Sequence, residues 1–323
     1  MPNKTGRVTA AQVARHSGVS QATVSYVLND NPSQKISPET RERVLRSVAE
    51  LGYTPFEPAR TLRSGHSAIV LFVMPDYPIG HVIDQVSAKL VGLLARQGRT
   101  LLTHRLSPGA PLVDIVRALH PVAVMSMTPL DATVREQMTA LGTRVEIIGF
   151  DESPGVDVRH PQERVGRMQA EHLVARGHRR LAYALPDDDR ARMFYRPRLE
   201  AIRTFCAERS VSDPLLGVVS ADIAQASQVL QEWRAEGVTG VCAFTDDVAI
   251  AVIGAAAASG IRVPDDLAVI GVDDIPLAAV TVPPLTTVHL DVEAMARALV
   301  RPLGMVEDAP VPDEAWVVQR STT

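Results

Sequence analysis

Apolar residues recur at helical spacing in the first 52 positions of the chain. Two such runs on either side of Gly18 predict a pair of short helices around a tight turn, because glycine readily adopts the left-handed backbone that the turn needs. Thr9 has Gln12 three residues on, which is the spacing of a capping box, and Ser20 is suited to cap the second helix. The apolar positions that join the two helices are Val13, Ala14, Val19, Val24, Val27 and Leu28.

A third helix follows, and after it a segment interrupted by prolines. Ser37 and Pro38 begin the helix as its cap and first helical residue, and Gly52 ends it. In residues 53–65 two prolines disfavour a helix before residue 58 and permit one at about 58–63, which is too short to be stable alone in water. The apolar stripe of the third helix consists of Val44, Leu45, Val48 and Leu51.

From residue 68 onward, short and nearly continuous apolar runs alternate with helical stretches. Such runs are typical of strands covered on both faces, and the alternation predicts parallel, doubly wound sheets that bind ligands at the carboxyl ends of their strands. The predicted fold is therefore an all-α helix-turn-helix head plus an α/β core. Strands are expected at Ala68–Met74, Val122–Met127, Val145–Phe150, Arg180–Leu185, Gly240–Phe244 and Leu267–Val272, and helices at about 81–97, 130–141, 163–176, 197–209, 222–236 and 247–259.

The second helix of the head, at about 21–28, directs Gln21, Ala22 and Tyr26 outward, as a helix that reads the major groove of DNA does. A glutamine can bond adenine through two atoms, whereas alanine offers only apolar contact, for example to a thymine methyl. The alternative is a small helical hairpin with no nucleic-acid partner. The candidates for phosphate contacts are Ser20, Thr23, Ser25 and Asn29.

Charge is distributed unevenly along the chain. Residues 1–65 carry nine Lys or Arg and five Asp or Glu, a net +4, while the remainder carries 24 basic and 32 acidic residues, a net −8. A basic head on an acidic body confines the attraction for phosphate to the head. Cys206 and Cys242 lie in apolar surroundings and are expected to be reduced core residues of a cytoplasmic protein, since no signal peptide or membrane-spanning run is seen.

Four motifs in the first 65 residues resemble the lactose-repressor (LacI/GalR) family of bacterial transcription regulators. They are Thr-Val-Ser-x-Val-Leu-Asn at 23–29, Ser-Pro-Glu-Thr-Arg-Glu-Arg-Val-Leu at 37–45, Glu-Leu-Gly-Tyr-x-Pro at 50–55 and Ala-Arg-x-Leu-Arg-Ser-Gly at 59–65. The resemblance implies a hinge helix whose Ala59 and Leu62 enter the minor groove, Leu62 as a wedge in the central base step. The alternative for Leu62 is local packing in a flexible linker.

The resemblance also implies a core like that of periplasmic sugar-binding proteins, with a ligand cleft between two lobes. It divides the chain into a DNA-binding domain at 1–52, a hinge at 53–65 and an effector-binding and dimerisation core at 66–323. The chain would cross between lobes near residues 161, 291 and 311; near the first crossing, where relatives often carry Asp-Asn, it has Pro161-Gln162. The first lobe would then comprise about 66–160 and 292–311, and the second about 161–291 and 312–323.

Five residues are the candidates for contacts with an effector. The resemblance points to Arg198 and Asp273, and to Asp246 where relatives commonly carry asparagine; Tyr77 and His81 would line the cleft from the first lobe. A guanidinium and a carboxylate together suit sugar hydroxyls, and a ligand with an amine stays open. The other interpretations are helix or turn capping for the two aspartates, a surface position for Arg198 and a helix start for His81.

The function predicted is a repressor that binds a palindromic operator in double-stranded DNA as a homodimer and is controlled by a small polar effector, for which a sugar is the expected class. No leucine-heptad tail follows Val318, which argues against a tail-mediated tetramer. No catalytic residue, metal, cofactor or membrane contact is expected, because the sequence shows no phosphate loop, nucleophile elbow or cluster of metal ligands. The alternatives are a periplasmic-type binding protein without a DNA role and an α/β enzyme acting on a sugar.

Overall fold

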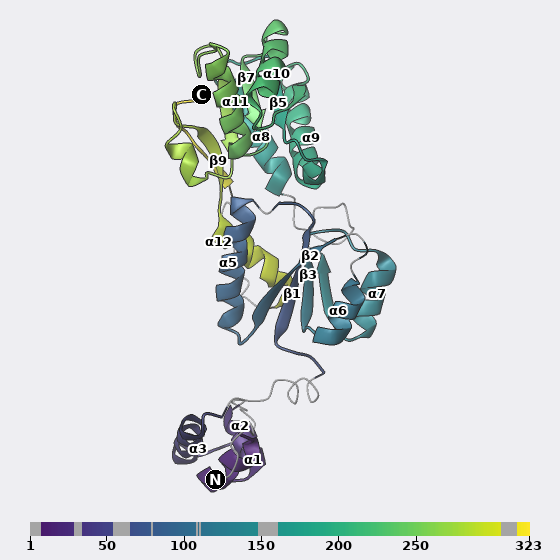
Figure 1. The fold of residues 1–323 in the computed structure, drawn as a ribbon, viewed down its shortest axis with the longest axis vertical. Helices are drawn as coiled ribbons and strands as arrows, with labels where there is room; N and C mark the ends of the chain where they lie inside the picture. Colours follow the sequence, from purple (N-terminus) through teal and green to yellow (C-terminus); the bar gives the residue numbers. More distant parts are fainter. Residues whose placement is uncertain are drawn as a thin grey trace. The chain divides into compact units, whose positions relative to one another are not determined.

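The computed structural model describes residues 8–28, 34–53, 65–78, 80–107, 109, 111–147, 161–304 and 315–323 (Figure 1). The chain divides into two compact units, Met1–Ser67 and Ala68–Thr323. The predicted hinge positions Ala59 and Leu62, and the predicted phosphate contact Asn29, lie outside the described residues.

The first unit is a three-helix head formed by α1 (Ala10–Ser17), α2 (Gln21–Leu28) and α3 (Pro38–Leu51). Local chemistry fixes the ends of these helices. The backbone N–H of Thr9 donates to Gln12 Oε1 over 2.8 Å, and that of Thr40 donates to Ser37 Oγ over 3.2 Å. Gly18 ends α1 with φ of 66°, a left-handed conformation that glycine adopts without strain.

A small apolar core joins the three helices of the head. Its buried members come from all three helices, and Arg43 Nε of α3 donates to Ser17 O of α1 over 2.9 Å. The buried core residues are Val13, Ala14, Val24, Val27 and Val44, with Val19, Leu28, Val48 and Leu51 packed against them. The helix-turn-helix head predicted from the sequence is confirmed.

The second unit contains two sheets, and the first of them defines lobe 1. Its strands are parallel in the order β2-β1-β3-β4. Successive residues of β1 point to opposite faces, so Val70 and Phe72 pack with the core on the α5 side, whereas Leu71 and Val73 pack with α6 and α7. The elements are β1 (Ile69–Pro75), α5 (His81–Ala95), β2 (Thr100–Leu106), α6 (Leu112–Leu119), β3 (Ala123–Ser126), α7 (Ala132–Ala140) and β4 (Arg144–Ile147).

The second sheet defines lobe 2, in the order β10-β9-β8-β7-β5-β6, and is parallel except for β10. Gln169 of α8 fixes this helix over the sheet, because its Nε2 donates to Ala243 O over 2.8 Å and also reaches Ile270 O and Gly271 O. The elements are α8 (Pro161–Ala175), β5 (Leu181–Leu185), η1 (Asp189–Ala191), α9 (Arg192–Glu208), β6 (Leu215–Val218), α10 (Ile223–Ala235), β7 (Gly240–Ala243), α11 (Asp246–Ala258), β8 (Ala268–Val272), η2 (Pro276–Ala279), β9 (Thr286–Leu290) and β10 (Ala315–Val318).

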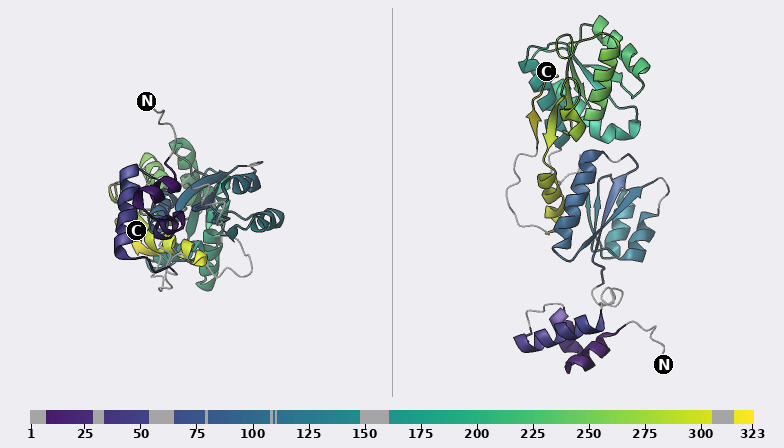
Figure 2. Two further views of the ribbon diagram at one scale, coloured as in Figure 1. Left: turned by 90° about the horizontal axis from the view of Figure 1, so that it is seen from below. Right: turned by 60° about the vertical axis from the view of Figure 1, so that its left-hand side comes forward.

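The chain passes from lobe 2 back to lobe 1 directly after β9. Asp291 caps α12 (Val292–Val300) by accepting from the N–H groups of Glu293 and Ala294, each over 3.0 Å. This helix lies beside α5 (Figure 2), and an ion pair of 3.2 Å joins Lys89 to Glu293. A 3₁₀ turn, η3 (Arg301–Leu303), follows, and the chain is described again in lobe 2 from β10.

The predicted α/β core of two doubly wound parallel-sheet lobes is confirmed, but several of its elements were not predicted. The strands missed were β2, β6, β9 and β10, and the helices missed were α6 and α12. Strand β2 lies at the edge of its sheet and exposes Thr100, Leu102 and Thr103, so it lacks the continuous apolar run used to find the central strands. Strand β6, with Leu216 and Val218 exposed, is the edge strand of the other sheet.

Candidate functional site

Helix α2 carries the candidate DNA-reading surface of the head. Its start is fixed by Ser20, whose Oγ accepts from the N–H of Thr23 over 3.0 Å. Val24 and Val27 are buried in the head core, so the opposite side of the helix faces solvent. On that side Gln21 and Ala22 are exposed and Tyr26 is half-buried. The predicted base-reading residues therefore fall on the side of α2 that does not pack on α1 and α3.

The candidate phosphate contacts differ in how much of each side chain is accessible. Ser20 is exposed, while Thr23 and Ser25 are half-buried. The hydroxyls of Ser20 and Thr23 share a hydrogen bond of 2.9 Å at the start of α2. The N–H groups of a helix start and nearby hydroxyls are both suited to bind phosphate oxygens.

In the second unit, the candidate effector residues Arg198, Asp246 and Asp273 lie in lobe 2, two of them at strand ends. Asp246 follows β7, and Asp273 follows β8. Strands β7 and β8 are neighbours in the parallel sheet, so their carboxyl ends meet at one edge. The sheet topology thus brings together residues that lie 27 positions apart in the sequence.

Asp273 occupies an unusual backbone conformation in a half-buried position. Its φ is 108°, in the left-handed region that residues with a side chain rarely adopt, and its N–H donates to Val288 O over 2.9 Å. Burial of the carboxyl raises the pKa of Asp273 to about 7; the nearby Arg198 charge opposes this rise, and Asp246 adds to it. A carboxyl with these surroundings gains from hydrogen-bond donors supplied by a ligand.

Arg198 of α9 is buried, with only 4% of its surface exposed, and its guanidinium is held in place by neutral acceptors. Its Nε donates to Gln162 Oε1 and its Nη1 donates to Phe244 O. The guanidinium carbon also lies 5.0 Å from the centroid of the Phe244 ring. These contacts orient the group without neutralising it, which leaves its charge available to a ligand.

Two residues that support Arg198 were not among the predicted site residues. Gln162 stood out in the sequence only as a departure from the family pattern, and the structure places its side-chain oxygen on Arg198 Nε. Gly166 lies where α8 crosses α9, and a Cβ at this position would overlap the backbone of Arg198. A glycine within a helix can indicate close packing against a second helix. The sequence alone did not identify Arg198, 32 residues later, as the residue that packs against Gly166.

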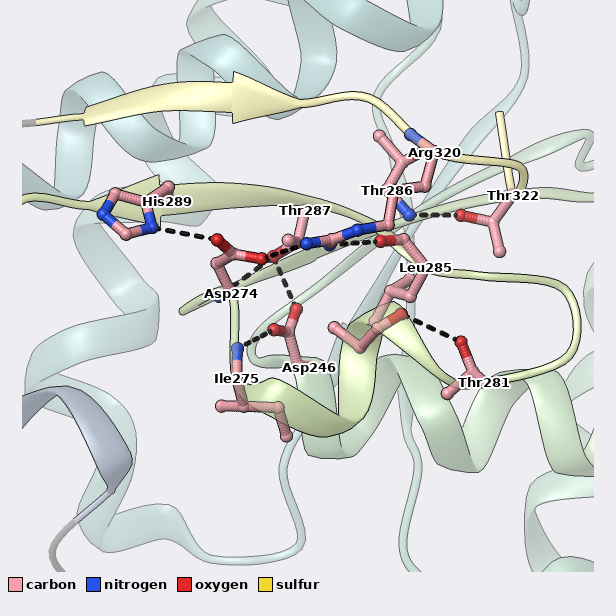
Figure 3. Close-up of polar contacts among 11 residues, drawn as sticks. Asp246, Asp274, Ile275, Thr281, Leu285, Thr286, Thr287, His289, Arg320 and Thr322 are labelled. Carbon is pink, nitrogen blue, oxygen red and sulfur yellow. Dashed lines mark hydrogen bonds and ion pairs between the residues drawn. The ribbon is translucent and has the colours of Figure 1, made fainter.

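Asp246 is completely buried, and both of its carboxyl oxygens accept hydrogen bonds from the protein. Oδ2 accepts from the N–H of Ile275 over 2.9 Å, and Oδ1 accepts from Thr287 Oγ1 over 2.5 Å (Figure 3). A Cβ at Gly271 would overlap Oδ1, so the missing side chain there makes room for the carboxyl. Burial raises the pKa of Asp246 to about 7, against the lowering effect of these two hydrogen bonds.

Asp274, the neighbour of Asp273, belongs to a second polar cluster that the sequence interpretation missed. Its Oδ1 accepts from Arg320 Nη2 over 2.6 Å, and its Oδ2 lies 2.9 Å from His289 Nδ1 (Figure 3). Although partial burial acts in the other direction, these two partners hold the pKa of Asp274 below its usual value. Asp274 and Arg320 lie 46 residues apart in the sequence, so no local pattern joins them.

Tyr77 and His81 are the residues of lobe 1 that the sequence predicted to line the cleft. The ring centroid of Tyr77 lies 5.9 Å from that of Phe194, and burial together with the charge of Asp188 raises the pKa of Tyr77. Asp273 also raises that pKa and Arg198 lowers it, so Tyr77 shares their electrostatic surroundings. His81 is the exposed first residue of α5, and its ring nitrogen is hydrogen-bonded to Gln85 one turn further on.

The described residues contain no group of three or more His, Cys, Asp or Glu arranged to hold a metal ion. Cys206 and Cys242 are buried free thiols in the structure. Within the part of the chain that the structure describes, no helix has the length and apolar character required to cross a bilayer.

Comparisons with known proteins match both units. Residues 9–55 match the model of the bacterial regulatory proteins, lacI family, and residues 170–322 match that of a periplasmic binding protein-like domain. The transcriptional regulator reg1 of Streptomyces lividans is 32% identical and covers 95% of this chain and 92% of its own length. MalR of Streptomyces coelicolor is 30% identical, with the same two coverages.

Solved structures agree with the fold over almost the whole chain. The lac repressor dimer bound to operator and the anti-inducer ONPF aligns with a TM-score of 0.76 and 24% identity, covering 98% of this chain and 99% of that one. The complex of the regulator CelR with cellobiose aligns with a TM-score of 0.65 and 25% identity, covering 98% and 100%. Family models, relatives and fold agree: the chain belongs to the lacI family of bacterial regulatory proteins and is a transcriptional regulator.

Proposed function

We propose that the protein is a repressor that binds a palindromic operator as a homodimer and responds to a small polar effector, a sugar, bound at the carboxyl ends of the strands of its core. The observation that carries this proposal is the arrangement of Arg198 and Asp273. Arg198 is hydrogen-bonded to Phe244 at the end of β7, and Asp273 follows the neighbouring strand β8, so a buried guanidinium and a carboxyl with a raised pKa lie at one edge of the sheet. Such a pair is suited to fix neighbouring hydroxyls through charge-assisted hydrogen bonds.

The contacts of Asp246 bear on the choice between a sugar and an amine. An aspartate in place of an asparagine would favour an amine if its carboxyl faced the ligand. Its two oxygens instead accept from Thr287 and from the backbone of Ile275, and the residue has no exposed surface. We therefore assign Asp246 to holding the turn that follows β8, which removes the reason to prefer an amine.

Aromatic rings near Arg198 also suit a sugar. The Tyr77 and Phe194 rings lie 5.9 Å apart, and Tyr195 meets the Phe244 ring edge-on at 6.2 Å. Phe194 and Phe244 are buried, and Arg198 covers the Phe244 ring. The half-buried Tyr77 and Tyr195 rings are therefore the ones that offer apolar surface to the C–H groups of a pyranose, while the charged groups bond its hydroxyls. CelR in complex with cellobiose and a LacI-family regulator with bound sucrose are structural neighbours of this chain.

A second copy of the chain is supported by exposed apolar residues in η2 and just after it. Leu277 is 52% exposed, Val280 is 69% exposed and Val282 is 90% exposed. Clustered exposed apolar side chains indicate an interface, and the lac repressor neighbour is a dimer bound to operator. Val280→Glu is expected to convert the dimer to a monomer in sedimentation, whereas an unchanged dimer would assign the interface elsewhere.

A dimer of such heads would read two half-sites of an inverted repeat, one with each α2 helix. An effector changes DNA affinity only through its different affinities for the DNA-binding and non-binding states. In this mechanism Arg198 and Asp273 bind the effector, and reorientation of the lobes moves the hinge segments that lead to the two heads.

Selection of the full-length protein on a random duplex library at near-physiological salt tests the DNA part of the proposal. Recovery of an inverted repeat supports a dimeric operator-binding protein. No enrichment, with or without pooled metabolites, would contradict it. Calorimetry with separate sugar, amine and nucleobase panels tests the effector part, and binding confined to the amines or nucleobases would overturn the sugar assignment.

A further inference from the structure

The turn that carries Asp273 is held in a conformation that its own residues disfavour. Asp273 and Asp274 both have positive φ, at 108° and 51°, although neither is glycine. Backbone of this kind persists only where the surroundings determine it. Three N–H groups of the turn are engaged: Asp273 with Val288 O over 2.9 Å, Asp274 with Thr287 Oγ1 over 3.4 Å and Ile275 with Asp246 Oδ2 over 2.9 Å.

The side chain of Asp274 also restrains the turn, because it binds residues outside the set of candidate effector residues. Its carboxylate joins Arg320 over 2.6 Å and His289 over 2.9 Å, and the side chains of Asp274 and Arg320 are only 18% and 19% exposed. Arg320 is itself fixed, because its Nη1 donates to Leu285 O over 2.8 Å and its N–H donates to Thr286 Oγ1 over 2.9 Å. A shielded pair with several hydrogen bonds is more rigid than an exposed ion pair.

His289 connects this pair to β10. It lies opposite Trp316 in the antiparallel register of β9 and β10, and the two rings stack with centroids 4.3 Å apart and planes at 30°. Strand β9 ends at Leu290, and the next residue caps α12, which packs on α5 in lobe 1. The stack therefore lies where the chain leaves lobe 2.

We propose that Asp274 is a positioning residue that couples the Asp273 turn to the β9–β10 pair, through Arg320 and through the stack of His289 on Trp316. The proposal rests on the proposed function in one respect, namely that Asp273 contacts the effector. When a ligand displaces the turn, the Asp274 carboxylate changes position with it. The carboxylate then displaces His289, and the Trp316 ring stacked on it is displaced as well, close to the point where β9 leads into α12 of lobe 1.

The two tryptophans of the chain make this coupling measurable in the full-length protein without a ligand. Trp316 is 45% exposed and stacked on His289, whereas Trp233 is buried in the lobe 2 core at 3% exposure. Labelling with 5-fluorotryptophan gives two fluorine resonances, which Trp316→Phe assigns. The Trp233 resonance then reports in each variant whether lobe 2 is folded.

Asp274→Asn is expected to move the Trp316 resonance and to leave the Trp233 resonance in place. In a His289→Gln background, which lacks the stacked imidazole, Asp274→Asn should cause a smaller shift than in the otherwise unchanged protein, because only the route through Arg320 remains. Asp266→Asn is the matched control. It breaks an exposed carboxylate–arginine pair with Arg262, at 2.8 Å, and should move neither resonance.

A second test perturbs the Asp273 turn at its other end, where Asp246 binds Ile275. Asp246→Ala frees the N–H of Ile275 at the far end of the turn and the hydroxyl of Thr287 on β9, so it should move the Trp316 resonance less in the Asp274→Asn variant than in the otherwise unchanged protein. Two results would overturn the proposal. One is that the Trp316 shifts caused by Asp246→Ala and Asp274→Asn add in the double variant; the other is that Asp274→Asn leaves the Trp316 resonance unchanged while the Trp233 resonance shows that lobe 2 is folded. Failure of the proposed function would show instead as absent DNA and sugar binding with the fluorine coupling intact.

Discussion

Arg198 lies over the ring of Phe244, with its guanidinium carbon 5.0 Å from the ring centroid, and donates to the carbonyl oxygen of the same residue. Phe244 directly follows β7, so one residue at the strand end fixes both the position and the plane of the guanidinium. Gln162 completes the arrangement from α8. This geometry uses the flat, forked shape of arginine, which lysine lacks.

Arg198→Lys is therefore expected to weaken binding of a saccharide identified in the calorimetric panel on the order of 10- to 100-fold, because one ammonium replaces several charge-assisted hydrogen bonds. Calorimetric titration of the purified variant measures the loss. Arg196→Lys is the control, since Arg196 is exposed on the same helix. Equal affinity of the Arg198 variant and the parent protein would exclude the guanidinium from the site.

Gly166→Ala is expected to destabilise the core through the α8–α9 crossing. The added Cβ would overlap backbone atoms of Arg198, which cannot move as a flexible side chain can. Overpacking of this kind costs about 1–3 kcal/mol of unfolding free energy. The comparison is Gly92→Ala on the exposed side of α5, where a Cβ meets nothing within 4 Å and should stabilise the helix by up to about 1 kcal/mol. Urea unfolding of both variants measures the free energy of unfolding, which should fall for Gly166→Ala and rise for Gly92→Ala.

Asp246→Asn is expected to change the pH dependence of stability. The folded pKa of Asp246, about 7, lies above the ordinary 3.8, so the folded state binds more protons between these values and its stability falls as pH rises through that window. Asparagine removes this fall and can still accept from Ile275 N–H and donate to Thr287 Oγ1. The variant should gain stability relative to the parent as pH rises through the window, on the order of 1.4 kcal/mol for each pH unit.

Thermal unfolding of the two proteins at several pH values measures this difference, and Asp246→Ala serves as the reference. The alanine variant leaves the buried donors of Ile275 and Thr287 without an acceptor, so it should be less stable than the asparagine variant at every pH. A stability difference between parent and Asp246→Asn that is independent of pH would contradict titration of this carboxyl.

Local chemistry made the head and the central strands predictable. The caps at Thr9 and Ser37 and the turn at Gly18 depend on residues within a few positions, and the structure shows each of them. Buried central strands such as β1 show continuous apolar runs. Edge strand β2 has a mixed pattern because half of it faces outward, and its sequence therefore did not indicate a strand.

The polar contacts of the candidate site were much less predictable. The sequence named Arg198, Asp246 and Asp273 through the family resemblance, but it did not show where each side chain points. The direction of Asp246 depends on Gly271 and Thr287, which approach it from neighbouring strands. Contacts of this kind arise from sheet order, which a single sequence does not encode locally.

Leu62→Ala tests the hinge residue named by the sequence, which lies outside the described residues. A leucine wedged into a base step stabilises a kinked duplex, so its removal should lower affinity for the selected operator on the order of 10-fold or more. Saccharide binding by the core should be unchanged, because the core is a separate compact unit. Fluorescence anisotropy with operator DNA measures the first quantity, and unchanged operator affinity would remove Leu62 from the wedge role.

Gln21→Ala should relax the sequence preference at one base pair and lower affinity only for operators that carry the preferred base there. Gln21 is exposed at the start of α2, and loss of a two-atom contact to one base removes about 1–3 kcal/mol of discrimination at that base pair. Ser20→Ala should instead weaken binding to all sequences alike, since Ser20 caps α2 and adjoins the phosphate candidates. Repeating the library selection with each variant separates the two effects: relaxed preference at one symmetric position in each half-site assigns Gln21 to base reading, whereas an unchanged consensus assigns that position to another residue of α2.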